Sequence, residues 1–229
     1  LTGEVGEVPL EGSLLPDTYK INRGTSRTAL IGRMQREQKR LVNEIWNRRA
    51  KDLTTIKNPR ELVTLASIVE KETGRADERN RVAGVFHNRL EKKMRLQSDP
   101  TITYGIVGGK PGGLGRPISR ADIDRPTPYN TYTINGLPPG PIANPGRASM
   151  EATANPSRTK ELFFVADGTG GHAFAETLEQ HNRNVMRWRQ IEAQRGPASP
   201  AGGNAVIPGA SAFQPVPGAP DGATTPGSA

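Results

Sequence analysis

The sequence predicts an α+β fold, in which several helices pack with a small antiparallel sheet. Two observations support this class. Apolar residues recur at the three- and four-residue spacing of amphipathic helices in several segments of the 229-residue chain. In addition, two short apolar segments flank the glycine-rich stretch 168–171, a pattern typical of a β-hairpin. The sequence contains no internal repeat, and several helices with one hairpin indicate the α+β class.

Six helices are expected, most of them opening with a capping residue, an acidic first turn or an early proline. They cover residues 25–49, 59–74, 77–93, 119–122, 144–154 and 177–195. The two strands cover residues 161–167 and 172–176. Residues 1–23, 95–117 and 127–146 show little periodicity and are expected to form turns and loops. The last of these is long enough to indicate a functional loop.

The two ends of the chain carry separate predictions. The C-terminal segment 196–229 consists mainly of Pro, Gly, Ala and Ser, and Asp221 is its only charged residue. Such a composition cannot offset the entropy of ordering by burial, so this segment is expected to be disordered. At the other end, the chain starts with Leu1, and residues 1–12 show no export signal. We therefore expect the chain to be a fragment of a longer protein.

The composition excludes several classes of protein. The chain has no cysteine, which rules out disulfides, thiolate zinc sites and cysteine nucleophiles. It has only three histidines and no HExxH pattern, so no metal and no cofactor are expected. The net charge of +8 favours a polyanionic partner, but no nucleic-acid-binding motif supports a nucleic acid. No segment approaches the roughly 20 apolar residues of a membrane span.

Glu70 is the strongest candidate for a catalytic residue. In the helix expected from Pro59, a rotation of about 100° per residue places Glu70 between Val63 and Ala66, on the edge of the apolar face. A carboxylate at such an edge is partly desolvated, so its proton affinity should rise, as a general acid requires. The alternative is a surface ion pair or a capping contact, which is the commoner role of a lone helical glutamate.

A second carboxylate is harder to find. Glu72 lies about 160° around the helix axis from Glu70, so both side chains cannot reach one substrate. Glu72 is expected to be structural, in an ion pair with an arginine. Asp99 is the better candidate, but it precedes Pro100 in an expected turn, where its side chain would bond to its own backbone.

Five segments, taken together and in order, carry a resemblance to a known family. They read EGSLLPDTY (11–19), LASIVEKE (65–72), MRLQSDPT (94–101), YNTYTINGLPPGPI (129–142) and FVADGTGGH (164–172). The chain resembles the YceG-like family of bacterial endolytic murein transglycosylases over about residues 10–195. The resemblance implies a helical, lysozyme-like catalytic core within a domain at residues 1–195. It also implies a longer parent protein, with an N-terminal membrane helix and a LysM-like part, at the outer face of the inner membrane.

The same resemblance implies that Glu70 matches the family's catalytic glutamate. The implied substrate is a peptidoglycan glycan strand, cut at the bond from N-acetylmuramic acid to N-acetylglucosamine. One carboxylate suffices for such a lytic transglycosylase: it protonates the glycosidic oxygen and then takes the proton of the C6 hydroxyl, which closes a 1,6-anhydro ring. Cell-wall synthases such as penicillin-binding proteins are the partners that the family suggests.

Five further residues are candidates for substrate binding. Gln97 and Ser98 follow the third helix, and a polar amide near the acid could hold an N-acetyl group. Tyr129, Asn130 and Tyr132 could form the floor of the groove, because a tyrosine offers an apolar face and a hydroxyl to a sugar. Two other functions remain open: a water-using muramidase with Asp99 as the second carboxylate, and a cell-wall-binding module without catalysis.

Overall fold

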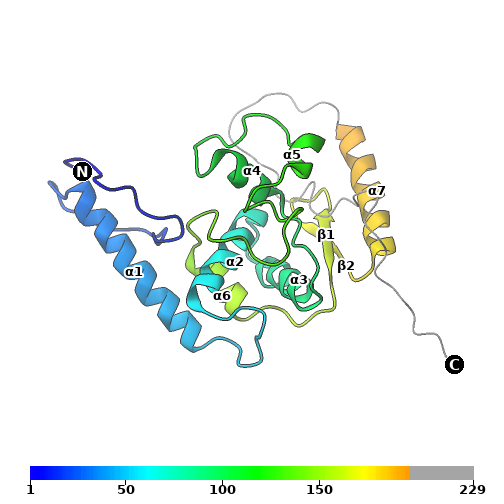
Figure 1. Cartoon of the computed structure of the whole chain (residues 1–229), viewed down its shortest axis with the longest axis horizontal. Helices are drawn as coiled ribbons and strands as arrows, with labels where there is room; N and C mark the ends of the chain where they lie inside the picture. The colour runs from blue at the N-terminus through cyan, green and yellow to red at the C-terminus, as the bar shows by residue number, and fades with distance from the viewer. Residues whose placement is uncertain (196–229) are drawn as a thin grey trace.

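The computed structural model describes residues 1–195 and confirms the α+β class (Figure 1). The predicted disorder of residues 196–229 lies outside the described residues. The elements are α1 (Arg27–Asn47), α2 (Pro59–Glu72), α3 (Arg79–Glu91), α4 (Asp99–Val107), α5 (Arg120–Asp124), α6 (Arg147–Ala154), β1 (Phe163–Ala166), β2 (His172–Ala175) and α7 (Leu178–Arg195). The strands β1 and β2 form an antiparallel hairpin in which Phe164 pairs with Phe174.

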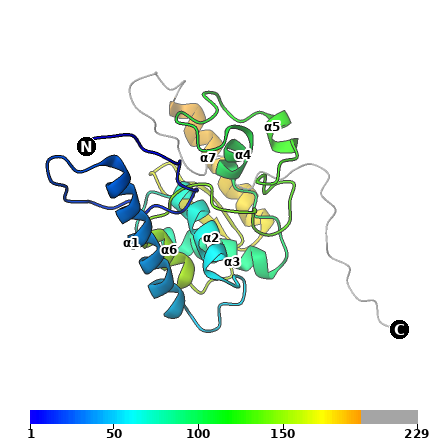
Figure 2. The same cartoon turned by 60° about the vertical axis from the view of Figure 1, so that its left-hand side comes forward.

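Helix α2 is the centre of the molecule. It contacts α1, α3, α4 and α6, and every residue from 62 to 69 is buried. The sequence predicted that one apolar face of this helix would be buried. In the structure, neighbouring helices cover α2 on several sides, so the buried surface is wider than that face. Helix α1 packs on one side of α2 and α6 (Figures 1 and 2). The hairpin and α7 lie beyond α3 on the other side (Figure 1).

Local sequence signals explain the start of most helices. The side chains of Ser26 and Asn58 accept hydrogen bonds from backbone N–H groups in the first turns of α1 and α2. Helix α5 begins with a complete capping box between Ser119 and Asp122, as its sequence predicts. The Arg116 guanidinium and the Ser119 hydroxyl both bond to Asp122, and they hold the pKa of that carboxyl well below its usual range.

Two boundaries differ from those that the sequence predicts. Residues 99–107 form α4, where a turn and a loop were expected, because Pro100 occupies the first turn of a helix rather than a turn of its own. Helix α6 begins at Arg147 with Gly146 as its N-cap, so the expected start at Asn144 was wrong. The Asn144 side chain instead accepts a hydrogen bond from Leu14 N–H over 3.0 Å and anchors the N-terminal segment.

The hairpin and α7 form a second, smaller core. Val165 of β1 packs with Val185 and Trp188 of α7. His181 is fully buried and stacks on Phe163 with ring centroids 5.1 Å apart, so this histidine packs within the protein interior. Among residues 1–195, no helix combines the length and the apolar composition that crossing a bilayer requires.

Candidate active site

Glu70 is half-buried on α2, and one of its carboxylate oxygens is fixed by the start of α6. Its Oε2 accepts hydrogen bonds from Gly146 N–H over 3.1 Å and from the Ser149 hydroxyl over 2.5 Å. Gly146 is the N-cap of α6, where backbone N–H groups lack partners within the helix. Oε1 makes no hydrogen bond with any described residue and is not buried, so it can exchange a proton with a ligand.

The loop before α6 runs along the face of α2 that carries Glu70. Ser67, one turn before Glu70, accepts a hydrogen bond from Ile142 N–H over 3.0 Å. Its own hydroxyl proton goes to Thr64 O over 2.7 Å. Ser67 and Glu70 lie one helical turn apart on α2 and accept hydrogen bonds from the loop backbone at residues 142 and 146. The loop is therefore attached to α2 at two points next to Glu70.

The motif at residues 11–19 borders the same site. A Cβ atom at Gly146 would lie 3.7 Å from Glu70 Oε2 and 3.8 Å from Pro16 Cγ, so Pro16 lies close to the carboxylate. Glu11, at the start of the motif, accepts a hydrogen bond from Asn144 Nδ2 over 3.1 Å. Burial raises the pKa of the Glu11 carboxyl, and the nearby charge of Lys71 opposes this shift. The structure therefore brings a second acidic residue close to the loop that holds Glu70.

Glu72 lies in the core, on the far side of α2 from Glu70. Its side chain is fully buried, and its Oε1 accepts a hydrogen bond from the Ser98 hydroxyl over 2.5 Å rather than from an arginine. Burial raises the pKa of Glu72 to about 8. The hydrogen bond from Ser98 lowers this pKa, and the charge of Asp99 raises it. A carboxyl in this position cannot reach a sugar, so it supports the structure.

Ser98 bonds this buried acid, and Tyr132 bonds Asp99, whose charge affects it. Ser98 is fully buried; its N–H donates to Thr131 Oγ1 over 2.9 Å, and its hydroxyl is the donor to Glu72. The Tyr132 hydroxyl donates to Asp99 Oδ1 over 2.6 Å, and its ring is almost completely buried. Asp99, at the first position of α4, is thus bonded to Tyr132 and shares no hydrogen-bond partner with Glu70 among the described residues.

Gln97 is half-buried and has an unusual backbone. Its φ angle of 52° is in the left-handed region, which non-glycine residues rarely adopt. Its Oε1 accepts a hydrogen bond from Arg89 Nη2 over 2.6 Å. Arg89 is 2% exposed, and burial lowers its pKa to about 9. Sequence analysis missed Arg89, since nothing in its helical pattern separates it from the exposed arginines.

Asn130 and Tyr129 have different environments. Asn130 is buried, and its amide donates to the carbonyl oxygens of Ile123 and Arg125 over 2.9 and 2.8 Å, which closes the loop after α5. Tyr129 is half-buried and packs against the ring of Tyr104. Of the five candidates for substrate binding, Gln97 and Tyr129 keep exposed surface, whereas Ser98, Asn130 and Tyr132 are buried. Their roles in binding stay predictions.

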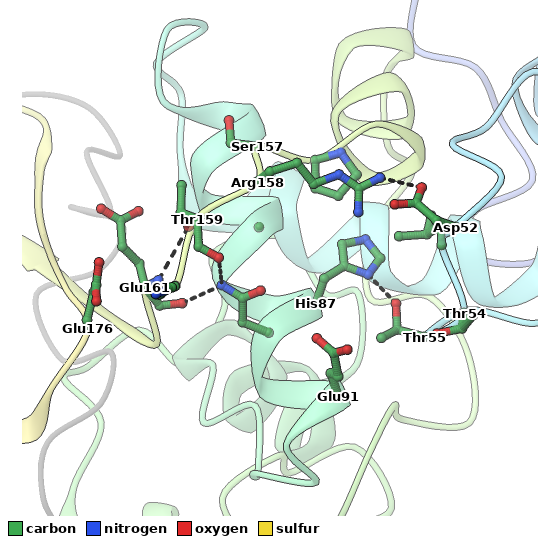
Figure 3. A pocket seen from close by; sticks show the side chains of 15 residues that line it. Asp52, Thr54, Thr55, His87, Glu91, Ser157, Arg158, Thr159, Glu161 and Glu176 are labelled. Atoms are coloured by element: carbon green, nitrogen blue, oxygen red, sulfur yellow. Dashed lines mark hydrogen bonds and ion pairs between the residues drawn. The ribbon is translucent and has the colours of Figure 1, made fainter.

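A separate cavity of about 680 Å³ lies between α3 and the segment before β1 (Figure 3). Its lining includes His87, Glu91 and Arg158 but not Glu70. The His87 ring bonds to the Thr55 hydroxyl and to Thr153 O, so both of its nitrogens have partners. Within residues 1–195, no group of three His, Cys, Asp or Glu side chains could hold a metal ion.

Comparison with known proteins supports a relationship over most of the chain. Residues 4–187 match the model of the YceG-like family. An endolytic murein transglycosylase of Bacillus subtilis is 39% identical over 76% of this chain and 47% of its own length. One of Streptococcus pneumoniae is 38% identical over 77% of this chain and 32% of its own length. The chain therefore spans less than half the length of these curated relatives.

A solved structure agrees with the sequence comparison. The crystal structure of a yceG-like protein from Listeria monocytogenes superposes with a TM-score of 0.65 at 37% identity. The match covers 79% of this chain and 57% of the other. By sequence and by fold, this chain belongs to the YceG-like family.

Proposed function

We propose that this chain cleaves peptidoglycan glycan strands endolytically as a lytic transglycosylase, with Glu70 as the general acid and then the general base. The observation that carries the proposal is the state of the Glu70 carboxylate. One oxygen is fixed by Gly146 and Ser149, and the other is open to a ligand. The relatives named endolytic murein transglycosylase support the substrate class.

The chemistry needs a single carboxyl group that changes its protonation state twice. Glu70 first protonates the glycosidic oxygen, and the bond to C1 of N-acetylmuramic acid breaks. The N-acetyl group of the sugar stabilises the cation that forms at C1. The Glu70 carboxylate then takes the proton of the C6 hydroxyl, which closes on C1 to form the 1,6-anhydro ring. No water is consumed, and the carboxyl ends in its starting state.

The hydrogen bonds to Oε2 suit this cycle. Both donors keep the carboxyl plane fixed while the proton leaves and returns at Oε1, so no side-chain reorganisation is needed between the two steps. The water-using alternative needs Asp99 as its second carboxylate. The Tyr132 hydroxyl donates to Asp99 Oδ1 over 2.6 Å, and this contact adds no support for that role. A module that only binds the cell wall would not require a carboxylate fixed in this way.

The site of action and the partners follow from the same proposal. Peptidoglycan lies outside the cytoplasmic membrane, so we propose that the protein to which this domain belongs works at the outer face of that membrane. Cell-wall synthases such as penicillin-binding proteins are the proposed partners, because they make the polymer that the proposed reaction cuts. Co-purification of the full-length protein with these synthases, before and after cross-linking, would test the partnership.

The test of the reaction is an analysis of its products. Purified sacculi are digested with the wild-type chain, with Glu70→Gln and with Glu91→Gln, and the fragments are identified by mass spectrometry. Glu91 is an exposed carboxylate on α3 away from Glu70, so Glu91→Gln is the matched control. We expect 1,6-anhydro-N-acetylmuramic acid ends from the wild type and the control, and no cleavage by Glu70→Gln. Reducing ends would identify a muramidase, and cleavage by Glu70→Gln would reject the mechanism.

A further inference from the structure

The carboxylate of Glu11 is fixed at one oxygen and open at the other. Asn144 Nδ2 donates to Glu11 Oε1 over 3.1 Å, and Asn144 is itself held by Leu14 N–H over 3.0 Å. Glu11 Oε2 makes no hydrogen bond with any residue in 1–195 and is not buried. A half-buried acceptor that is fixed before a ligand arrives binds a donor at low entropic cost.

A pair of tyrosine rings begins close to this open oxygen. A Cβ atom at Gly109 would be 2.7 Å from Glu11 Oε2 and 4.0 Å from Tyr104 Cε2, so both side chains lie next to Gly109. The Tyr104 ring packs against Tyr129 with centroids 4.7 Å apart and planes tilted by 57°. Both rings are half-buried and keep part of their surface exposed.

The electrostatics agree with this proximity. Burial raises the pKa of the Tyr104 hydroxyl, and the charges of Glu11 and Tyr129 raise it further. The Glu11 carboxyl is also partly desolvated, and the charge of Lys71 acts on it. A hydrogen bond to a carboxylate in such surroundings is stronger than the same bond at an open surface.

A short piece of backbone connects Glu11 to Glu70. Asn144 holds Glu11, and Gly146 N–H holds Glu70. The Cα atoms of residues 144 and 146 are at most about 7 Å apart, so the two residues that bond these carboxylates are near neighbours in the loop. Pro16, from the same motif as Glu11, also approaches Glu70 through Gly146. One loop therefore bonds both carboxylates and leaves one oxygen of each open.

We propose that Glu11, Tyr104 and Tyr129 form a saccharide subsite that binds a sugar unit next to the bond cut at Glu70. The inference rests on the proposed function. In this subsite, the exposed ring surface takes the C–H face of an N-acetylated sugar, and Glu11 Oε2 accepts a hydrogen bond from a hydroxyl or an acetamido N–H. Glu11 positions the strand and exchanges no proton in the reaction.

The experiment measures binding separately from cleavage. Peptide-free glycan strands, prepared from amidase-treated sacculi, are titrated against Glu70→Gln, Glu70→Gln/Glu11→Gln, Glu70→Gln/Tyr104→Leu and Glu70→Gln/Glu91→Gln. Cleavage kinetics of the single variants Glu11→Gln and Tyr104→Leu are measured in parallel. Circular dichroism and thermal melting check each fold. Gln at position 11 can still accept the bond from Asn144, so Glu11→Gln removes the charge with little change to the loop.

We expect Glu11→Gln and Tyr104→Leu each to raise Kd and KM about tenfold, with kcat changed by less than about threefold and the melting temperature retained. Glu91→Gln should bind like its parent. Wild-type binding by Glu11→Gln, or a change confined to kcat, would overturn the subsite. A loss of binding that follows a lower melting temperature in both variants would overturn it as well. Cleavage by Glu70→Gln would reject the proposed function, whereas the binding comparison still tests the subsite.

Discussion

The Ser149 hydroxyl donates a hydrogen bond of 2.5 Å to Oε2 of Glu70, across 79 residues of sequence. Ser149 is the third residue of α6 and is fully buried, so its side chain has little freedom to turn away. Glu70 is thus oriented by a second helix as well as by its own. Residues that position a catalytic carboxylate in this way act on the rate of the reaction more than on the affinity for substrate.

Removal of the Ser149 hydroxyl should therefore reduce kcat. A hydrogen bond to a charged group contributes about 1.5–3 kcal/mol, so we expect Ser149→Ala to lower kcat about tenfold or more while KM stays within about threefold. Gly146 N–H remains as the second donor to Oε2, which is why activity should survive. Cleavage of soluble glycan strands, followed by chromatography of the anhydro products, gives both constants.

The control for this variant is Ser157→Ala, because Ser157 is half-buried at the cavity of Figure 3 and does not contact Glu70. Equal kcat values for Ser149→Ala and Ser157→Ala would show that the hydroxyl of Ser149 does not position the carboxylate.

Glu72 should make the protein less stable as the pH rises. Its pKa is about 8 in the folded state against 4.5 for a free side chain, so the folded state holds the proton more tightly. Its contribution to stability is fully present below about pH 4.5 and is lost as the pH rises to about 8, by at most about 1.4 kcal/mol per pH unit. Glu72→Gln, a neutral isostere, should flatten this slope in urea unfolding between these two values. An unchanged slope would mean that Glu72 is ionised in the folded protein.

His87 should give the opposite dependence at acid pH. Burial lowers its pKa from 6.5 to about 4. Between these pH values, the imidazole is protonated in the unfolded chain and neutral in the folded protein. The contribution of neutral His87 to stability is present above about pH 6.5 and is lost as the pH falls to about 4. We expect His87→Gln to be less stable than the wild type at neutral pH, by about 1–3 kcal/mol, and to lose less stability on acidification.

The measurement for His87→Gln is the free energy of unfolding in urea at about pH 5 and about pH 7, because these values lie within and above the range of the shift. The double variant with Glu72→Gln separates the two slopes, which have opposite signs where their pH ranges overlap. An identical loss for wild type and His87→Gln on acidification would contradict the prediction.

Local sequence patterns predicted most of the helices and both strands. They also predicted the partial burial of Glu70. The spacing of apolar residues identified α2, and the rotation per residue placed Glu70 at the edge of its buried face, as the structure confirms. Helix α4 was missed because a proline after an aspartate is compatible with a turn as well as with a first helical turn. The choice depends on packing of Thr101 and Ile102 into the interior, which no local pattern reveals.

The partners of Glu70 could not be predicted in this way. Gly146 and Ser149 are 76 and 79 residues from Glu70, and Asn144 joins Glu11 over 133 residues. Such pairs form only when α6 packs on α2, and one sequence contains no signal for the register of that contact. Ser98 is a further example, because the sequence predicted it as a candidate for substrate binding and contained no signal for its burial and its bond to Glu72.

Substitution of Arg89 should lower the stability of the protein strongly, because its side chain is a buried polar group with several partners. Its guanidinium donates to Arg95 O and Leu162 O, each over 2.8 Å, and to Gln97 Oε1 over 2.6 Å. It thereby joins the end of α3 to the start of the hairpin. Arg89→Met keeps the length of the side chain but leaves three partly buried acceptors without this donor, so we expect a loss of about 3 kcal/mol of stability.

Arg89→Lys should recover little of this loss, because one ammonium group cannot reach three acceptors that a planar guanidinium serves at once. Arg187→Met, at an exposed position of α7, is the matched control and should change stability by less than about 0.5 kcal/mol. Urea unfolding gives the three values. If Arg89→Met were as stable as Arg187→Met, the buried guanidinium would not hold the hairpin to the helical core, and the left-handed Gln97 would need another support.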